Sequence, residues 1–182
     1  MDEKGGISVQ TEHIFPVIKR WLYSDKDIFL REIVSNACDA VTKLKHLSSI
    51  GQAEGIGSDF AVYVRVDRDA GTIIVSDNGI GMSAEEVKKY INQIALSGAL
   101  DFIEKYEGNN EASNSGIIGH FGLGFYSAFM VADTVQIDTK SYTDAPAVLW
   151  KGTDEGDYEM TDSAKTDRGT DIIMHIAEDS KE

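Results

Sequence analysis

The stretch REIVSNACDA, residues 31–40, carries both an apolar repeat and polar side chains at helical spacing. It lies within a helix that the sequence predicts from about Asp25 to Leu47, with Ser24 as its N-cap. Four polar residues fall within an arc of roughly 60° at about 100° per residue: Glu32, Asn36, Asp39 and Lys43. The opposite and flanking surface is apolar, with Leu30, Ile33, Val34, Ala37, Val41 and Leu44. We therefore expect this helix to pack its apolar face on a sheet and to carry a polar stripe.

The polar stripe has two interpretations. It is compatible with a solvated helix face that carries one ion pair between Asp39 and Lys43. However, Asn and Asp are poor residues for a helix interior, so their presence needs a reason. A magnesium–nucleotide site supplies one, because the carboxamide oxygen of Asn36 is a hard ligand that Mg²⁺ accepts. Glu32, one turn away, would then orient or deprotonate a water molecule for attack on a γ-phosphate.

Two glycine-bearing segments complete the candidate site. The segment DNGIGM, residues 77–82, follows a predicted strand, and GHFGLGF, residues 119–125, precedes a predicted helix. In the first, glycines let the backbone approach a flat ligand while Asp77 accepts hydrogen bonds from an exocyclic amine such as that of adenine; a plain tight turn fits equally. In the second, backbone N–H groups at a helix N-terminus suit an anion, although glycines that only permit close packing also fit. No Gly-Lys-Ser/Thr follows, so the segment is not a P-loop.

Composition limits the class of protein. The 182 residues, 42% of them hydrophobic, suit one globular domain, with the polar segment 107–116 as a mobile insert. The net charge of −14 disfavours a nucleic-acid partner. No apolar run approaches the roughly 18 residues that span a membrane, and the polar N-terminus is not a signal peptide. The single cysteine, Cys38, excludes an internal disulfide; we expect it to be a packed small side chain in a reducing cytoplasm.

The remaining pattern predicts an α+β fold. Strands are expected at 60–66 and 72–76, joined by the turn 68–71, and later at 134–142, 147–151, 158–161 and 170–176. Ser83 is expected to cap a helix with Glu86 at the capping-box position, and a further helix is expected over about 123–132. The predicted helices come mostly early in the chain and most of the strands come late. This order indicates a two-layer α/β sandwich, with helices on one face of a mostly antiparallel sheet.

Taken together in their order along the chain, the three motifs resemble a known superfamily, whereas none of them is specific alone. E-x-x-x-N-x-x-D-A on a helix, D-x-G-x-G after a strand and G-x-x-G-x-G before a helix resemble the gyrase, heat-shock chaperone, histidine kinase and MutL superfamily with its Bergerat-type ATP-binding fold. Segments 23–32, 31–40 and 118–129 are most similar to the ninety-kilodalton heat-shock chaperones, of bacterial high-temperature protein G type. The likeness extends from about Thr11 to Ile176.

The resemblance implies roles for individual residues. Glu32 would be the catalytic base, Asn36 the magnesium ligand, and Asp77 the partner of the adenine amine. The other implied nucleotide-binding residues are Asp39, Gly81, Met82, Asn92, Gly122, Leu123, Gly124, Phe125 and Thr170. A mobile lid is implied at about 94–119. Leu96 and Ala99 stand there where relatives often carry a basic residue and a threonine, and His120 stands where glutamine is frequent.

At the level of function, the resemblance implies an N-terminal ATP-binding domain over residues 1–182. Magnesium-dependent ATP binding and slow hydrolysis would drive a cytoplasmic chaperone that assists protein folding in the heat-shock and stress response. Client proteins and a homodimer would be contacted through middle and C-terminal domains that lie outside this sequence, and the γ-phosphate cation would come from the middle domain. No nucleic-acid or membrane partner is expected. The alternatives are a DNA-handling ATPase of gyrase or mismatch-repair type, a histidine kinase catalytic domain, and a nucleotide-sensing module without ATPase activity.

Overall fold

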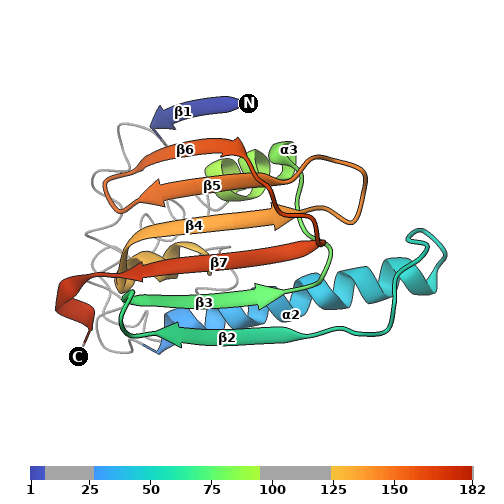
Figure 1. Cartoon of the computed structure of the whole chain (residues 1–182), viewed down its shortest axis with the longest axis horizontal. Coiled ribbons are helices and arrows are strands. Elements are labelled where there is room, and N and C mark those ends of the chain that lie inside the picture. The colour runs from blue at the N-terminus through green and yellow to red at the C-terminus, as the bar shows by residue number, and fades with distance from the viewer. Residues whose placement is uncertain (7–26, 95–123, 182) are drawn as a thin grey trace, which may run out of the picture.

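The computed structural model describes residues 1–6, 27–94 and 124–181 (Figure 1). The strands are β1 (Asp2–Gly6), β2 (Val62–Asp67), β3 (Thr72–Asp77), β4 (Ala132–Lys140), β5 (Val148–Thr153), β6 (Asp157–Asp162) and β7 (Gly169–Ile176). The helices are α2 (Ile28–Ser49), α3 (Ala84–Val87), the π-helix η1 (Lys88–Ile94) that continues α3, and the 3-10 helices η2 (Tyr126–Met130) and η3 (Glu178–Ser180). Among the helices that the structure describes, none combines the length with the apolar composition that a membrane span requires.

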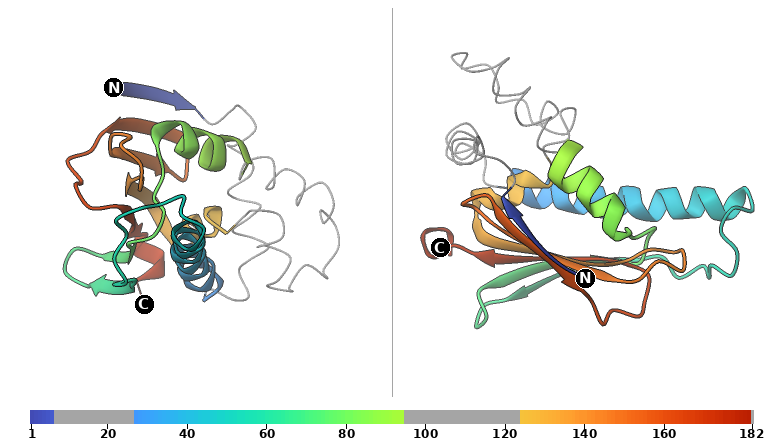
Figure 2. Two further views of the ribbon diagram at one scale, coloured as in Figure 1. Left: turned by 90° about the vertical axis from the view of Figure 1, so that its right-hand side faces the viewer. Right: turned by 90° about the horizontal axis from the view of Figure 1, so that it is seen from above.

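The described strands form one antiparallel sheet in the order β1-β6-β5-β4-β7-β3-β2. Helices α2 and α3 lie on the same face of this sheet, as the view from above shows (Figure 2). The expected α+β fold, with helices layered on one face of an antiparallel sheet, is confirmed.

The register of the central strands decides which side chains meet beneath the helices. Thr170 of β7 pairs with Asp77 of β3 on one side and with Thr139 of β4 on the other. Two residues further along β7, Ile172 pairs with Val75 and Ile137 in the same way. Since alternate residues of a strand point to the same face, a polar row and an apolar row lie side by side under α2.

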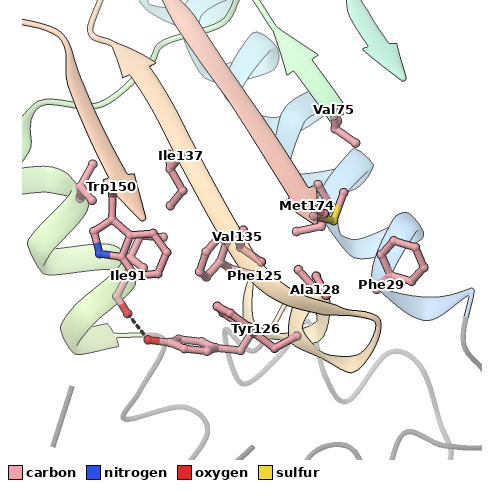
Figure 3. Close-up of a cluster of buried hydrophobic side chains, with 14 of the residues drawn as sticks. Phe29, Val75, Ile91, Phe125, Tyr126, Ala128, Val135, Ile137, Trp150 and Met174 are labelled. Carbon is pink, nitrogen blue, oxygen red and sulfur yellow. Dashed lines mark hydrogen bonds between the residues drawn. The ribbon is translucent and has the colours of Figure 1, made fainter. Parts of the chain in front are cut away.

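The core lies between this sheet face and the helices (Figure 3). Phe125 contacts Tyr126 and Trp150 edge-on, with ring centroids 5.5 and 5.6 Å apart. The buried Tyr126 hydroxyl donates to the Ile91 carbonyl oxygen at 2.9 Å, which joins η2 to η1. The expected apolar face of α2 is confirmed, because Ile33, Ala37, Val41 and Leu44 are buried.

Two details differ from the sequence-based expectation. Helix α2 begins at Ile28 rather than near Asp25, and Asp27 precedes it without a side-chain cap; Ser24 lies outside the described residues. The helix expected over 123–132 is only the short η2, because Ala132 already begins β4. The Ser127 hydroxyl also donates to the Gly124 carbonyl oxygen at 2.5 Å, a local bond that competes with helical pairing.

Two further features were missed or wrongly predicted. Strand β1 was not predicted, because its five residues are polar or glycine and it is defined by pairing with β6. The N-terminal ammonium group also pairs with Asp162 at 2.7 Å.

The expectation that Cys38 is packed is wrong, since Cys38 is exposed. It follows the buried Ala37, and one residue along a helix turns a side chain by about 100°, here out of the core and toward solvent.

Candidate functional site

A cavity of about 460 Å³ lies above the sheet between α2 and the α3–η1 helix. This volume is in the range of small-molecule sites, roughly 300–1,000 Å³. The polar stripe of α2 forms part of its lining, with Glu32, Asn36, Asp39 and Lys43. The stripe therefore borders the cavity, and Asn36, Asp39 and Lys43 are also exposed to solvent.

At one end of the cavity, Glu32 and Asn36 lie beside Gly124. A Cβ atom added to Gly124 would lie 2.8 Å from Oε2 of Glu32 and 3.3 Å from Nδ2 of Asn36. A side chain at this position would therefore fill the space between the two polar groups. Burial raises the pKa of Glu32, while the neighbouring Arg31 guanidinium lowers it. A carboxylate with a raised pKa is a stronger base, as proton abstraction from water requires.

The residues at this end fit a magnesium ion that is held mainly by a bound nucleotide. The Asn36 side chain is exposed, and within the described residues its amide has no hydrogen-bond partner. The described residues hold no group of three or more His, Cys, Asp or Glu side chains that would form a protein-only metal site. Mg²⁺ commonly keeps several waters and takes one or two protein oxygens with substrate phosphates. Asn36 would supply that protein oxygen.

At the other end of the cavity, Asp77 is the last residue of β3, and it is only 9% exposed to solvent. Its Oδ1 accepts the Gly79 N–H at 2.8 Å. Burial raises the pKa of Asp77 to about 6, although the Gly79 and Thr170 N–H groups lower it. At neutral pH the carboxyl group is therefore mostly ionised and accepts hydrogen bonds without donating any.

A hydroxyl pair fixes the surroundings of Asp77. The Thr139 and Thr170 hydroxyl oxygens are 2.8 Å apart, and both side chains are buried. The Thr139 oxygen also accepts the Met82 N–H at 3.0 Å. The bend after β3 is tied to α2 as well, because the Ile80 N–H donates to the Ala40 carbonyl oxygen at 3.1 Å. Helix, bend and sheet are thus held together at this end of the cavity.

Most of the predicted site residues that the structure describes line this single cavity. They are Glu32, Asn36, Asp39, Asp77, Gly81, Met82, Gly124, Phe125 and Thr170. Gly122, Leu123, Leu96, Ala99 and His120 lie outside the described residues, as does the predicted lid apart from its first residue, Ile94.

Asn92 is placed differently from the prediction. It is not among the residues that line the cavity; its side-chain oxygen accepts the Trp150 indole N–H at 3.1 Å. Sequence reasoning instead missed Glu86 and Tyr90, which line the wall opposite α2. Their spacing of four residues places them on one helix face, which is the signal that could have found them.

Comparison with known proteins agrees with this arrangement. The family described as "Histidine kinase-, DNA gyrase B-, and HSP90-like ATPase" matches residues 26–167. The chain is 55% identical to the chaperone protein HtpG of Porphyromonas gingivalis over 183 residues, which is 100% of this chain and 26% of that protein. It is 55% identical to HtpG of Bacteroides thetaiotaomicron over 99% of the chain and 26% of the relative.

A more distant relative shows the same coverage. HtpG of Actinobacillus pleuropneumoniae is 44% identical over 99% of this chain and 29% of its own length. The chain thus spans between 26% and 29% of the length of these relatives. The family match covers most of the chain and includes α2, α3, β3 and β4, which border the cavity, so the chain belongs to the histidine kinase-, DNA gyrase B- and HSP90-like ATPase family.

Proposed function

We propose that this chain binds ATP together with Mg²⁺ and hydrolyses it slowly, and that this reaction drives the conformational cycle of a molecular chaperone. The observation that carries the proposal is that the α2 polar stripe, Asp77 and Gly124 all line one cavity of about 460 Å³. The three relatives named above are all chaperone proteins, which supports the chaperone role.

The two ends of the cavity suit the two ends of the nucleotide. The adenine amine would donate to the ionised Asp77 carboxylate, beside Thr170 and Gly81. The phosphates would lie at Asn36 and Gly124. Along α2, the seven-residue interval from Glu32 to Asp39 corresponds to about 10 Å at 1.5 Å per residue, a distance that a ribose and its phosphates can span.

The hydrolytic step would depend on Glu32. Its carboxylate would accept a proton from the attacking water, and burial favours this by raising its pKa. Asn36 would hold the magnesium ion through its amide oxygen, and the ion would neutralise charge on the phosphate oxygens. Gly124 and Phe125 would border the phosphates, with Gly124 leaving room beside Glu32 and Asn36.

The cellular role is the wider part of the proposal. The longer protein would act in the cytoplasm in the stress response, and its remaining regions would contact client proteins and form a homodimer. The net charge of −14 supports a protein-directed role over the DNA-handling alternative, because such a surface repels a phosphate backbone.

Calorimetric titration with ADP, ATP and GTP, each with and without Mg²⁺, tests nucleotide binding. We expect both adenine nucleotides to bind, ATP with the larger dependence on Mg²⁺, and GTP to bind far more weakly. The reason is that guanine presents a carbonyl oxygen where adenine presents the amine that faces Asp77. GTP affinity equal to that of ATP would contradict the adenine assignment. Single-turnover measurement of γ-phosphate release then separates an ATPase from a nucleotide-sensing module, which would release none.

A further inference from the structure

Lys140 ends β4 and directs its ammonium group into the loop that follows. The Nζ atom donates to three backbone carbonyl oxygens, those of Ser141 at 3.2 Å, Thr143 at 2.9 Å and Ala145 at 2.9 Å. An ammonium group has three N–H donors, so these three bonds use all of them. Within the described residues, no carboxylate forms an ion pair with Lys140. The lysine therefore fixes the conformation of its own loop and does not bridge to another element.

Side chains within the loop complete this arrangement. The Ser141 hydroxyl oxygen accepts the Thr143 N–H at 3.2 Å and bonds with the Thr143 hydroxyl at 2.9 Å. The Thr143 hydroxyl oxygen in turn accepts the Ala145 N–H at 3.4 Å. These hydrogen bonds join residues that are only two positions apart in the sequence. Without the ammonium group of Lys140, the three carbonyl oxygens would converge with no donor between them.

The loop and the end of β4 lie directly against the bend that borders the adenine end of the cavity. The Tyr142 N–H donates to the Ile80 carbonyl oxygen at 2.9 Å. A Cβ atom on Gly81 would overlap the carbonyl group of Lys140, and Gly81 has a φ of +62°, which other residues rarely adopt. Ile80, Gly81 and Met82 all line the cavity. The position of this wall thus depends on the backbone that Lys140 holds.

We infer that Lys140 is a positioning residue for nucleotide binding: its three hydrogen bonds hold the loop over residues 141–145 so that the bend from Ile80 to Met82 stays in place to receive adenine. Lys140 does not line the cavity and would not touch the nucleotide. This inference rests on the proposed function, because it assigns the bend to the adenine end of an ATP site.

The test compares Lys140→Met with the unmodified chain and with Lys151→Met. Methionine keeps a long apolar side chain without donors, and Lys151 is an exposed lysine on the neighbouring strand β5, so its replacement controls for the loss of one charge. We expect Lys140→Met to weaken the binding of adenosine and of ADP by the same factor, about three- to tenfold. The reason is that the bend from Ile80 to Met82, which the substitution would disturb, is proposed to contact only the adenine base. Lys151→Met should bind both ligands as the unmodified chain does.

Amide hydrogen exchange of the ligand-free proteins provides a second readout. In Lys140→Met the Tyr142 and Met82 amides should exchange at least about tenfold faster, while the Ile172 amide in the middle of the sheet keeps its rate. Unchanged affinities, a loss confined to ADP, or uniformly faster exchange that includes Ile172 would each overturn the inference. If the unmodified chain bound neither ligand, the proposed function would fail, and the exchange rates would still decide whether Lys140 holds the bend.

Discussion

At the scale of single residues, Glu32 and Asn36 occupy one end of the cavity with different proposed tasks. Glu32→Ala should leave ADP and ATP affinity within a few-fold, because the carboxylate is proposed to act on water and not on the nucleotide. Hydrolysis should fall by about 10²- to 10⁴-fold, the usual contribution of a general base. Glu32→Gln, which keeps the side-chain volume beside Gly124, serves as the matched control and should lose activity to the same degree. A large loss of ATP affinity with normal turnover of bound ATP would rule out this role.

Asp77 is proposed to anchor adenine, so Asp77→Asn should weaken ADP and ATP equally. A buried hydrogen bond to a charged group contributes about 1.5–3 kcal/mol, which is roughly ten- to a hundredfold in affinity. Both nucleotides carry the same base, and the ratio of their dissociation constants should therefore stay constant. Calorimetry on the variant measures this, and unchanged binding of both would show that Asp77 is not the anchor.

The raised pKa of Asp77 predicts opposite effects of pH on binding and on stability. ADP affinity should decline below about pH 6, because the protonated carboxyl group loses an acceptor site for the adenine amine. For the ligand-free fold, a pKa raised from 3.8 means that the protonated form is the stabilising one. That contribution is complete below about pH 4 and is lost as the pH rises through about 6.

Asp77→Asn should therefore stabilise the ligand-free chain at pH 7.5. A shift of about two pKa units sets an upper limit of about 3 kcal/mol for the gain. The gain should shrink as the pH falls toward 4, where Asp77 itself becomes neutral. Urea unfolding of both proteins at several pH values measures the difference, and a gain that is independent of pH would point to a cause other than ionisation.

At the scale of elements, the wall of the cavity opposite α2 depends on a capping box. The Ser83 hydroxyl accepts the Glu86 N–H at 3.3 Å, and Glu86 accepts the Ser83 N–H at 2.7 Å. Ser83→Ala should destabilise the chain by about 1 kcal/mol in urea unfolding, the usual cost of a lost N-cap. Ser58→Ala, at an exposed position outside any helix or strand, is the control and should be neutral. Equal stability of the two variants would show that the cap does not contribute.

The elements that could be predicted from sequence are those specified by local pattern. The β2–β3 hairpin and the capping box at Ser83 were predicted and are present, because turn residues and cap residues act over a few positions. Strand β1 was missed because only its pairing with the distant β6 makes it a strand. The short η2 was likewise not predicted, because Ala132 already begins β4 through its pairing with the distant Ile176 of β7.

The residues of the candidate site divide in the same way, into those whose position the local sequence determines and those whose position it does not. Glu32, Asn36 and Asp77 could be predicted because helical spacing and the end of a strand determine where they lie. The position of Asn92 could not be predicted in this way, since α3 continues as the π-helix η1 from Lys88. A π-helix has wider turns than an α-helix and so changes which side chains face the cavity. No sequence pattern in this segment signals that change.

At the scale of the whole molecule, the distribution of charge around the cavity predicts a slow enzyme. Among the described residues, Lys43 is the only basic side chain that lines the cavity. It follows Glu32 by 11 positions, about 16 Å along the helix axis, and so lies far from the proposed γ-phosphate end. Phosphoryl transfer needs positive charge near the equatorial oxygens of the γ-phosphate, and an added arginine can raise the rate by about a thousandfold or more.

We therefore expect the 182-residue chain to bind ADP readily and to hydrolyse ATP very slowly. The chain spans only 26–29% of the length of its relatives, and we expect the cation near the γ-phosphate to come from the part of those relatives that this chain does not cover. Joining this chain to the remaining region of an HtpG relative should raise turnover at saturating MgATP by at least about tenfold. Replacing a candidate arginine of that region should remove the gain without weakening ADP binding if that arginine acts on the γ-phosphate, since ADP lacks that phosphate. If the 182-residue chain alone turned over as fast as the longer protein, the cation would already be present within it, and the charge argument would be wrong.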